Sequence, residues 1–184
     1  MPIDLLAFTG RQQAGKTTAA KHIAATLGFT RLSFADPIRR MLIAIGLTAE
    51  DLSERKEIPH ALLGFKTPRY AMQTVGTEWG RNLIHDDLWL NIARHDIEQA
   101  RRFPDFRGIV IDDCRFDNEA ALVRALGGVV IHITRLDTPQ IASTHASEKG
   151  VSMMLIDGTI AAHDGDENGL RIAALTEFQD MQTP

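Results

Sequence analysis

The feature that most constrains this chain is the stretch FTGRQQAGKTTAAKHIA, which begins at Phe8. It contains one match to the pattern G-x-x-x-x-G-K-[ST], made by Gly10, Gly15, Lys16 and Thr17. An apolar run precedes the match and a helical pattern of apolar residues follows it, so the glycines lie at a turn from strand to helix. The first amides of a helix have no partner inside it, and the helix dipole favours an anion there. The sequence therefore predicts a loop that binds the phosphates of a nucleoside triphosphate.

The residue types in this loop suit phosphate chemistry. Gly10 and Gly15 let the backbone curl around a phosphate with no Cβ in the way. The Lys16 ammonium is expected to reach the β- and γ-phosphates, and the Thr17 hydroxyl is expected to coordinate Mg²⁺. The alternative interpretation is a glycine-rich turn that carries a lysine by accident.

Length and charge exclude several classes of protein. The 184 residues correspond to one domain with a full core, and the net charge of −4 argues against a partner that is a nucleic-acid polymer. No apolar run approaches the roughly 20 residues that span a bilayer, and the start of the chain, with Asp4, does not resemble a signal peptide. The single cysteine, Cys114, cannot form an internal disulfide. We therefore expect a cytoplasmic protein with no membrane partner, and a homodimer remains open.

Apolar runs alternate with helical patterns along the chain. This alternation predicts an α/β fold, a doubly wound parallel sheet of five strands with helices on both faces. The strands are expected at 4–9, 29–35, 108–113, 129–134 and 155–162, and the helices at 16–27, 37–46, 68–84, 86–102, 117–126 and 167–181.

Ligands of such sheets bind at the carboxyl ends of the strands, where further candidate residues lie. An acidic residue at such an end holds Mg²⁺ in phosphate-loop proteins, and we favour Asp113 over Asp112 for this role. Arg115 and Arg135 are expected to stabilise the charge that spreads over a transferred phosphoryl group. The places predicted to face one cleft are the Gly10 loop, Ser33–Asp36, Asp112–Arg115 and Thr134-Arg135.

The segment QTVGTEWGRNLI, residues 73–84, is unusual for a plain helix. Gly76 and Gly80 are costly inside a helix, and they make sense where the backbone closely approaches another group. Trp79 is suited to stack on a base, with Gln73 and Arg81 beside it. The alternative is that Trp79 belongs to the core and that the glycines serve packing, and composition alone does not decide between the two.

Five motifs occur in a characteristic order between residue 5 and about residue 150: GRQQAGKTT, SFADPIRRML, TPRYAMQTVGTEWGRNLIHDDLW, VIDDCRFDNEA and HASE. In this order they resemble the bacteriophage-type deoxynucleoside monophosphate kinases, and the Thr-Glu-Trp-Gly-Arg core of the third motif is the most specific part. More distantly, the layout is similar to that of phosphomevalonate kinase. Both belong to the nucleoside-monophosphate-kinase-like group of P-loop NTPase folds.

The resemblance implies phosphorylation of a deoxynucleoside monophosphate to the diphosphate by direct in-line transfer, with ATP as donor and Mg²⁺ as cofactor. It implies catalytic roles for Lys16, Arg115 and Arg135, and magnesium ligation by Thr17 and Asp113. The residues it implies for the donor phosphates are Gly10, Gln13, Ala14, Gly15, Lys16, Thr17 and Thr18. Those it implies for the monophosphate are Asp36, Arg40, Arg69, Gln73, Trp79, Arg81, Asn118 and Glu119.

The resemblance also implies how the single kinase domain, 1–184, is divided. A helical insertion at about 36–104 would bind the monophosphate, and a short lid at about 138–150 would close over the site and exclude water. The core would comprise 1–35, 105–137 and 151–184. If the chain is encoded by a phage, the expected location is the host cytoplasm.

Two other functions remain open. A kinase of the same fold would act on another small phosphate ester, such as phosphomevalonate, and Trp79 discriminates because only a nucleotide offers a base for stacking. A regulatory ATPase would bind nucleotide in order to switch, and would hydrolyse it slowly without an acceptor.

Overall fold

The computed structural model describes residues 2–137 and 150–183. The predicted lid at 138–150, with the HASE motif, therefore lies outside the described residues except for Gly150. The chain divides into two compact units. Unit 1 comprises Met1–Ser33 and Asp96–Pro184, and unit 2 comprises Phe34–His95.

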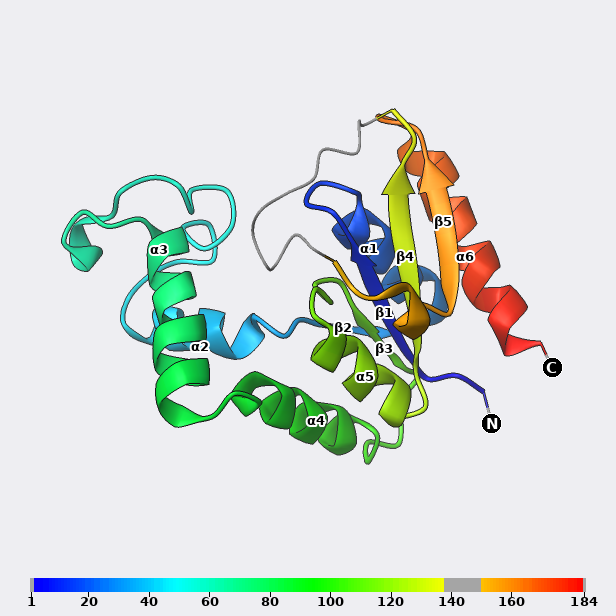
Figure 1. Cartoon of the computed structure of the whole chain (residues 1–184), viewed down its shortest axis with the longest axis horizontal. Helices are drawn as coiled ribbons and strands as arrows, with labels where there is room; N and C mark the ends of the chain where they lie inside the picture. The colour runs from blue at the N-terminus through cyan, green and yellow to red at the C-terminus, as the bar shows by residue number, and fades with distance from the viewer. Residues whose placement is uncertain (1, 138–149, 184) are drawn as a thin grey trace. The chain divides into compact units, whose positions relative to one another are not determined.

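Unit 1 is built around a parallel five-stranded sheet in the order β2-β3-β1-β4-β5 (Figure 1). Strand β1 is central, and it pairs with β3 on one side and with β4 on the other. The predicted α/β class and parallel five-stranded sheet are confirmed. The strands are β1 (Leu5–Gly10), β2 (Thr30–Leu32), β3 (Ile109–Ile111), β4 (Val129–Arg135) and β5 (Gly158–Ala162).

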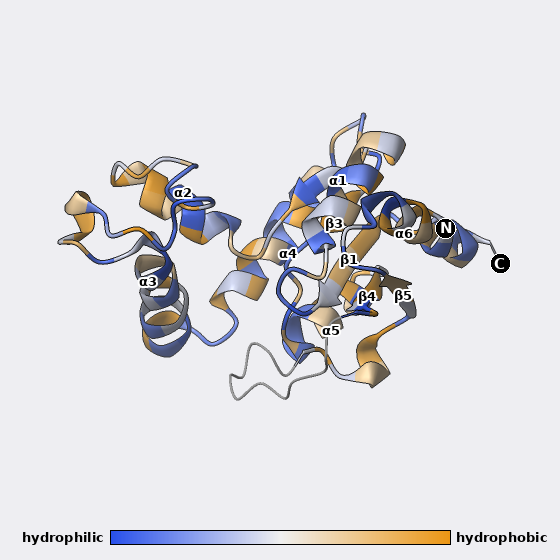
Figure 2. Cartoon of the chain, turned by 90° about the horizontal axis from the view of Figure 1, so that it is seen from above, coloured by the Kyte–Doolittle hydropathy of each residue, from blue (hydrophilic) through white to orange (hydrophobic). Residues whose placement is uncertain are grey.

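Helices cover both faces of this sheet. Alternate residues of a strand point to opposite faces, and both faces of the central strand carry buried apolar side chains. Leu6 and Phe8 of β1 share one apolar core with α1 and α6, which also contact each other. Leu5 and Ala7 are fully buried on the opposite side, where α5 contacts β1 and β4. The central strand is accordingly mostly hydrophobic (Figure 2). These helices are α1 (Lys16–Leu27), α5 (Asp117–Ala125) and α6 (Glu167–Gln182), and a short 3₁₀ helix, η4, spans Met153–Leu155.

Unit 2 is helical and has an apolar core of its own. Its helices are α2 (Asp36–Ala44), the short 3₁₀ helix η1 (Ala61–Leu63), α3 (Pro68–Gln73), η2 (Thr74–Ile84) and the first part of α4 (Leu88–Ala100). The buried residues of its core are Ile38, Leu42, Leu47, Leu52 and Trp89.

The helix η2 differs from the sequence-based expectation of one regular helix over 68–84. Thr74–Ile84 forms a π-helix, in which each amide bonds to a carbonyl five residues earlier. The bond from the His85 amide to the Gly80 carbonyl, at 3.0 Å, has this spacing. π-Helices are rare in proteins, and many of those that do occur lie at functional sites.

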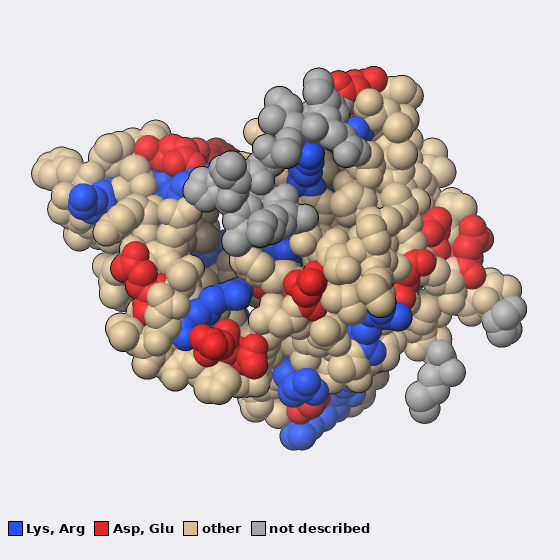
Figure 3. Space-filling view, in the orientation of Figure 1, with Lys and Arg blue, Asp and Glu red and all other residues tan. Residues whose placement is uncertain are grey.

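The net charge of −4 is small for 184 residues. On the face shown in Figure 3, basic and acidic side chains are interspersed. Of the helices in the described part of the chain, none combines the length and the apolar character needed to cross a membrane.

Candidate active site

The loop between β1 and α1 has a backbone that only glycine suits at two positions. Gly10 and Gly15 have φ angles of +139° and +100°. A Cβ atom on Gly10 would lie 2.5 Å from the Ile133 carbonyl oxygen, and one on Gly15 would lie 2.4 Å from the Leu170 side chain. Left-handed φ angles and this crowding together exclude a side chain. The sequence pattern therefore corresponds to a loop of defined shape.

The N-terminus of helix α1, which follows the loop, is the positive end of the helix dipole. Helix α1 has no side-chain cap at Gly15 and no acidic residue in its first turn. Helix α6, by contrast, is capped by Asp166, whose carboxylate accepts a hydrogen bond from the Gly169 amide. The first-turn amides of a helix and its dipole favour an anion, and the start of α1 offers both.

The other predicted loop residues have distinct positions. The amide of Ala14 donates to the Arg11 carbonyl at 3.2 Å, so this amide is already used inside the loop. Gln13 is exposed and has a φ angle of +64°. Thr17 is exposed in the first turn of α1. Their contacts with a nucleotide stay predictions.

The Lys16 ammonium lies at the loop itself. It donates hydrogen bonds to the carbonyl oxygens of Gly10, at 2.7 Å, and Arg11, at 2.6 Å. Burial lowers the pKa of Lys16 to about 8, and the positive charge of Arg115 acts in the same direction. A phosphate beside this ammonium would favour its charged form.

We expect the affinity for Mg–ATP to fall above about pH 8 because of Lys16. As the pH rises through the lowered pKa, Lys16 in the free protein loses its proton, and the neutral amine no longer pairs with phosphate. Since the bound state favours the proton, the logarithm of Kd should rise by up to about one per pH unit beyond that point. Calorimetric titration between pH 7 and pH 9.5 measures this slope. Lys16→Arg, which stays protonated throughout, should give a flat profile, and a flat profile for the unmodified protein would contradict the expectation.

The two aspartates after β3 have different partners. The Asp112 carboxylate forms an ion pair with the Arg31 guanidinium at 2.8 Å. The Asp113 carboxylate accepts a hydrogen bond from the Ser33 hydroxyl. Both negative charges raise the pKa of Lys16, so both lie close to the loop. Asp113 stays the predicted metal ligand, and its carboxylate is positioned by the Ser33 hydroxyl.

The oxygen atoms near the loop fit a magnesium ion that arrives with its nucleotide. Mg²⁺ in such sites takes one or two protein oxygens and completes its shell with phosphates and water. Thr17 and Asp113 supply oxygens of this kind. Within 2–137 and 150–183, no group of three or more His, Cys, Asp or Glu residues forms a metal cage.

Arg135 lies against the phosphate-binding loop. Its guanidinium donates to the His163 carbonyl and lies 3.8 Å from the Asp164 carboxylate. A Cβ atom on Gly15 would be 2.9 Å from its Nη2 atom. Its side chain is only 13% exposed. The structure therefore brings Arg135 to the loop, as the topology predicted.

Arg115 and its neighbours occupy the turn from β3 into α5. Arg115 is exposed, and its charge acts on Lys16. The buried Glu119 accepts hydrogen bonds from the amides of Arg115, at 2.7 Å, and Phe116, at 3.1 Å. Glu119 thus holds the backbone that carries Arg115, whereas Asn118 is exposed on α5. Substrate contact by these two residues stays a prediction.

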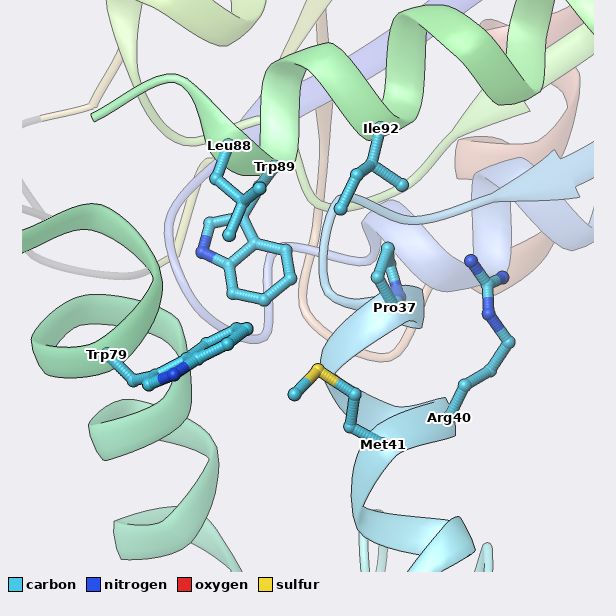
Figure 4. A pocket seen from close by; sticks show the side chains of 7 residues that line it. All are labelled: Pro37, Arg40, Met41, Trp79, Leu88, Trp89 and Ile92. Carbon is cyan, nitrogen blue, oxygen red and sulfur yellow. The ribbon is translucent and has the colours of Figure 1, made fainter. Parts of the chain in front are cut away.

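Unit 2 contains a hollow of about 420 Å³ (Figure 4). Arg40 and Trp79, two of the predicted substrate residues, line it. The ring of Trp79 lies 6.2 Å from that of Trp89, with the planes tilted by 46°. A mostly apolar hollow with aromatic walls and a guanidinium suits a flat base that carries an anionic group. The lining residues that sequence reasoning missed are Pro37, Met41, Leu88, Trp89 and Ile92.

The other predicted residues of unit 2 do not line this hollow. Asp36 forms an ion pair with Arg39 at 2.8 Å, and Arg69 forms one with Glu57. Gln73 is exposed at the end of α3, and Arg81 is half-buried on η2. Their predicted role in binding the monophosphate is not tested by these contacts.

A second hollow, of about 440 Å³, lies between α1 and α6 in unit 1. Its lining is polar, and Arg171 forms an ion pair with Glu167 there at 2.7 Å. Only Thr18 among its lining residues was predicted from the sequence. The full lining is Thr18, Lys21, His22, Glu167 and Arg171.

The parallel sheet and the glycine-bounded loop before α1 define the class of phosphate-loop nucleotide-binding proteins. Comparison with known families gives a closer assignment. The model of the family "Deoxynucleotide monophosphate kinase" matches residues 66–170, more than half of the chain. The chain belongs to the deoxynucleotide monophosphate kinase family, which confirms the resemblance seen in its motifs.

Two relatives and two solved structures are similar to the chain over most of its length. The inferred deoxynucleotide monophosphate kinase of Acanthamoeba polyphaga mimivirus is 35% identical over 157 residues, which cover 78% of this chain and 80% of the relative. The deoxynucleoside-5′-monophosphate kinase of Escherichia phage T5 is 33% identical over 137 residues, covering 71% of this chain and 52% of the relative. The chain thus matches about half the length of the phage protein.

A sugar kinase from Janibacter sp. HTCC2649 has 16% identity and a TM-score of 0.49, with 97% of this chain and 95% of that chain covered. Shikimate kinase from Acinetobacter baumannii has 16% identity and a TM-score of 0.47, with 97% and 93% covered.

Proposed function

We propose that this protein phosphorylates deoxynucleoside monophosphates to diphosphates, with ATP as the phosphoryl donor and Mg²⁺ as the cofactor. The observation that carries this proposal is the loop from Gly10 to Thr17, in a chain of the deoxynucleotide monophosphate kinase family. Its backbone shape, the positive end of α1 and the Lys16 ammonium all favour the same ligand, a chain of phosphates.

The donor is assigned to unit 1. The phosphates of ATP would contact the loop amides and Lys16, and the nucleoside would extend toward the hollow that Thr18 helps to line. Thr17 and Asp113 would hold Mg²⁺, which neutralises phosphate charge when bound. Lysine and arginine side chains around that hollow suit an anionic or polar ligand.

The acceptor is assigned to the 420 Å³ hollow of unit 2. Its base would stack on Trp79, and its phosphate would pair with Arg40. The name of the family and the names of the two relatives support a deoxynucleotide as the acceptor. Phosphomevalonate, which has no ring to stack, would leave the aromatic walls of the hollow without a partner.

The chain's own residues would act by positioning and charge. The acceptor is a phosphate oxygen that is already ionised near neutral pH, so the transfer needs no strong general base. Lys16, Arg115 and Arg135 would stabilise the charge that spreads over the transferred group during in-line displacement. Arg135 is nearly buried beside Gly15, which keeps its guanidinium close to the loop.

Trp79→Ala tests the acceptor assignment. Loss of base stacking, which contributes about 1–3 kcal/mol per base, should raise the KM for the deoxynucleoside monophosphate about tenfold or more. The KM for ATP should stay within about twofold, because Trp79 belongs to unit 2. Leu83→Ala is the matched control, since Leu83 lies on the same π-helix but is 75% exposed and does not line the hollow. Equal monophosphate KM values for the Trp79 and Leu83 variants would contradict the assignment.

A further inference from the structure

We propose that Trp89 is a positioning residue of the acceptor site, which holds the π-helix η2 in the shape that presents Trp79 to the base. This inference rests on the proposed function for the identity of the ligand. The inference explains why the segment that carries Trp79 is a π-helix with two buried glycines, Gly76 and Gly80.

The indole of Trp89 is bound to the backbone of η2. Trp89 is only 4% exposed, and its Nε1 atom donates a hydrogen bond to the Gly76 carbonyl at 2.7 Å. A buried indole N–H needs such a partner, because an unpaired one costs free energy. Gly76 belongs to the π-helix and precedes Trp79 in the sequence. This bond therefore connects α4 to η2 just before Trp79.

The same indole also packs against η2 directly after Trp79. A Cβ atom on Gly80 would lie 2.4 Å from Cζ2, 2.7 Å from Cε2 and 2.8 Å from Nε1 of Trp89. The glycine at this position is therefore required by the space that Trp89 occupies. In a regular helix without such a neighbour, the same glycine would be less favourable than alanine.

Trp89 thus contacts η2 on both sides of Trp79 in the sequence, at Gly76 and at Gly80. Both tryptophan rings line the hollow, one from η2 and one from α4 (Figure 4). Fixing a ring before the ligand arrives reduces the ordering that binding would otherwise require. The expected consequence is tighter binding of the monophosphate, with no effect on the donor.

Trp89→Phe tests this inference, since it removes the indole N–H and keeps an aromatic ring. Loss of one neutral hydrogen bond should raise the monophosphate KM about fivefold, whereas kcat and the KM for ATP should change less than about twofold. The control is Leu47→Val, another core residue of unit 2, which should lower the thermal midpoint without changing either KM. The same monophosphate KM in Trp89→Phe as in Leu47→Val would overturn the inference and leave Trp89 with a purely structural role.

A measurement on the unmodified protein covers the case in which Trp89→Phe does not fold. The chain has two tryptophans, so ¹⁵N spectra contain two indole N–H signals. Addition of dTMP should shift the Trp79 signal and slow hydrogen exchange at the Trp89 indole. A shift of the Trp79 signal with unchanged exchange at Trp89 would overturn the inference. If no deoxynucleoside monophosphate perturbs either signal, the proposed function itself fails.

Discussion

Lys16→Ala is expected to reduce kcat by about a thousandfold or more while the protein stays folded. The ammonium lies at the loop that would hold the donor phosphates, and each tenfold loss in rate corresponds to about 1.4 kcal/mol of transition-state stabilisation. Removal of one well-placed charge from a phosphoryl-transfer site accounts for a loss of this size.

The fold is expected to tolerate this substitution because the hydrogen bonds of the Lys16 ammonium and the cost of burying its charge act in opposite directions. Burial lowers the pKa of Lys16 from 10.5 to about 8, so the unfolded chain binds more protons than the folded one between these values. The charged lysine therefore disfavours the folded state below about pH 8, and this cost disappears as the pH rises toward 10.5. Lys16→Ala removes this cost together with the hydrogen bonds to the Gly10 and Arg11 carbonyls, so its thermal midpoint at pH 7 should change by no more than about a few degrees.

Steady-state kinetics and thermal unfolding check this prediction together. Lys66→Ala is the matched control, since Lys66 is exposed in unit 2 and its ammonium lies 5.3 Å from the Tyr70 ring. That variant should keep its turnover within about twofold, as surface substitutions usually do. If Lys16→Ala retains most of its turnover, the phosphate-binding assignment of the loop is wrong.

Asp113→Asn is expected to lower kcat about a hundredfold and to raise the Mg²⁺ concentration needed for half-maximal activity. The substitution keeps the size of the side chain and removes the charge that a magnesium ligand supplies. The amide still has an oxygen that accepts a hydrogen bond from Ser33, so the local structure should persist. Magnesium titrations of the rate at saturating ATP measure both effects.

Asp112→Asn serves as the control for position, because Asp112 is adjacent and also follows β3. Its carboxylate pairs with Arg31 at 2.8 Å, and the side chains of Asp112 and Arg31 are 12% and 39% exposed. Because Asp112 pairs with Arg31 and is not the predicted ligand, the Asp112 variant should keep the magnesium dependence of the unmodified protein. If the Asp112 variant is the one that needs more magnesium, the ligand has been assigned to the wrong carboxylate.

The sheet and the loop were predictable from the sequence because local patterns determine them. Buried parallel strands give continuous apolar runs, such as GIVI before Asp112, and glycines are required where φ is positive, as at Gly10 and Gly15. The topology rule then placed Asp113, Arg115 and Arg135 near Lys16, because the carboxyl ends of parallel strands meet at one edge.

The partners of these residues were not predictable, because they depend on contacts between distant parts of the chain. Ser33 and Asp113 are 80 residues apart, and Arg31 and Asp112 are 81 apart. The hollow of unit 2 depends in the same way on how α2, η2 and α4 pack. The glycines at 76 and 80 were a signal that the backbone approaches another group, but only the structure identifies that group at Gly80 as Trp89.

Release of ADP in a coupled assay tests the central claim most directly. The protein would be mixed with ATP and Mg²⁺ and then with dAMP, dGMP, dCMP, dTMP, the four ribonucleotides or phosphomevalonate. Rapid ADP release that depends on a deoxynucleoside monophosphate, with formation of the matching diphosphate, is the predicted result. Release with phosphomevalonate alone would contradict the acceptor, and slow release that is independent of any acceptor would contradict the kinase and indicate a nucleotide-dependent switch.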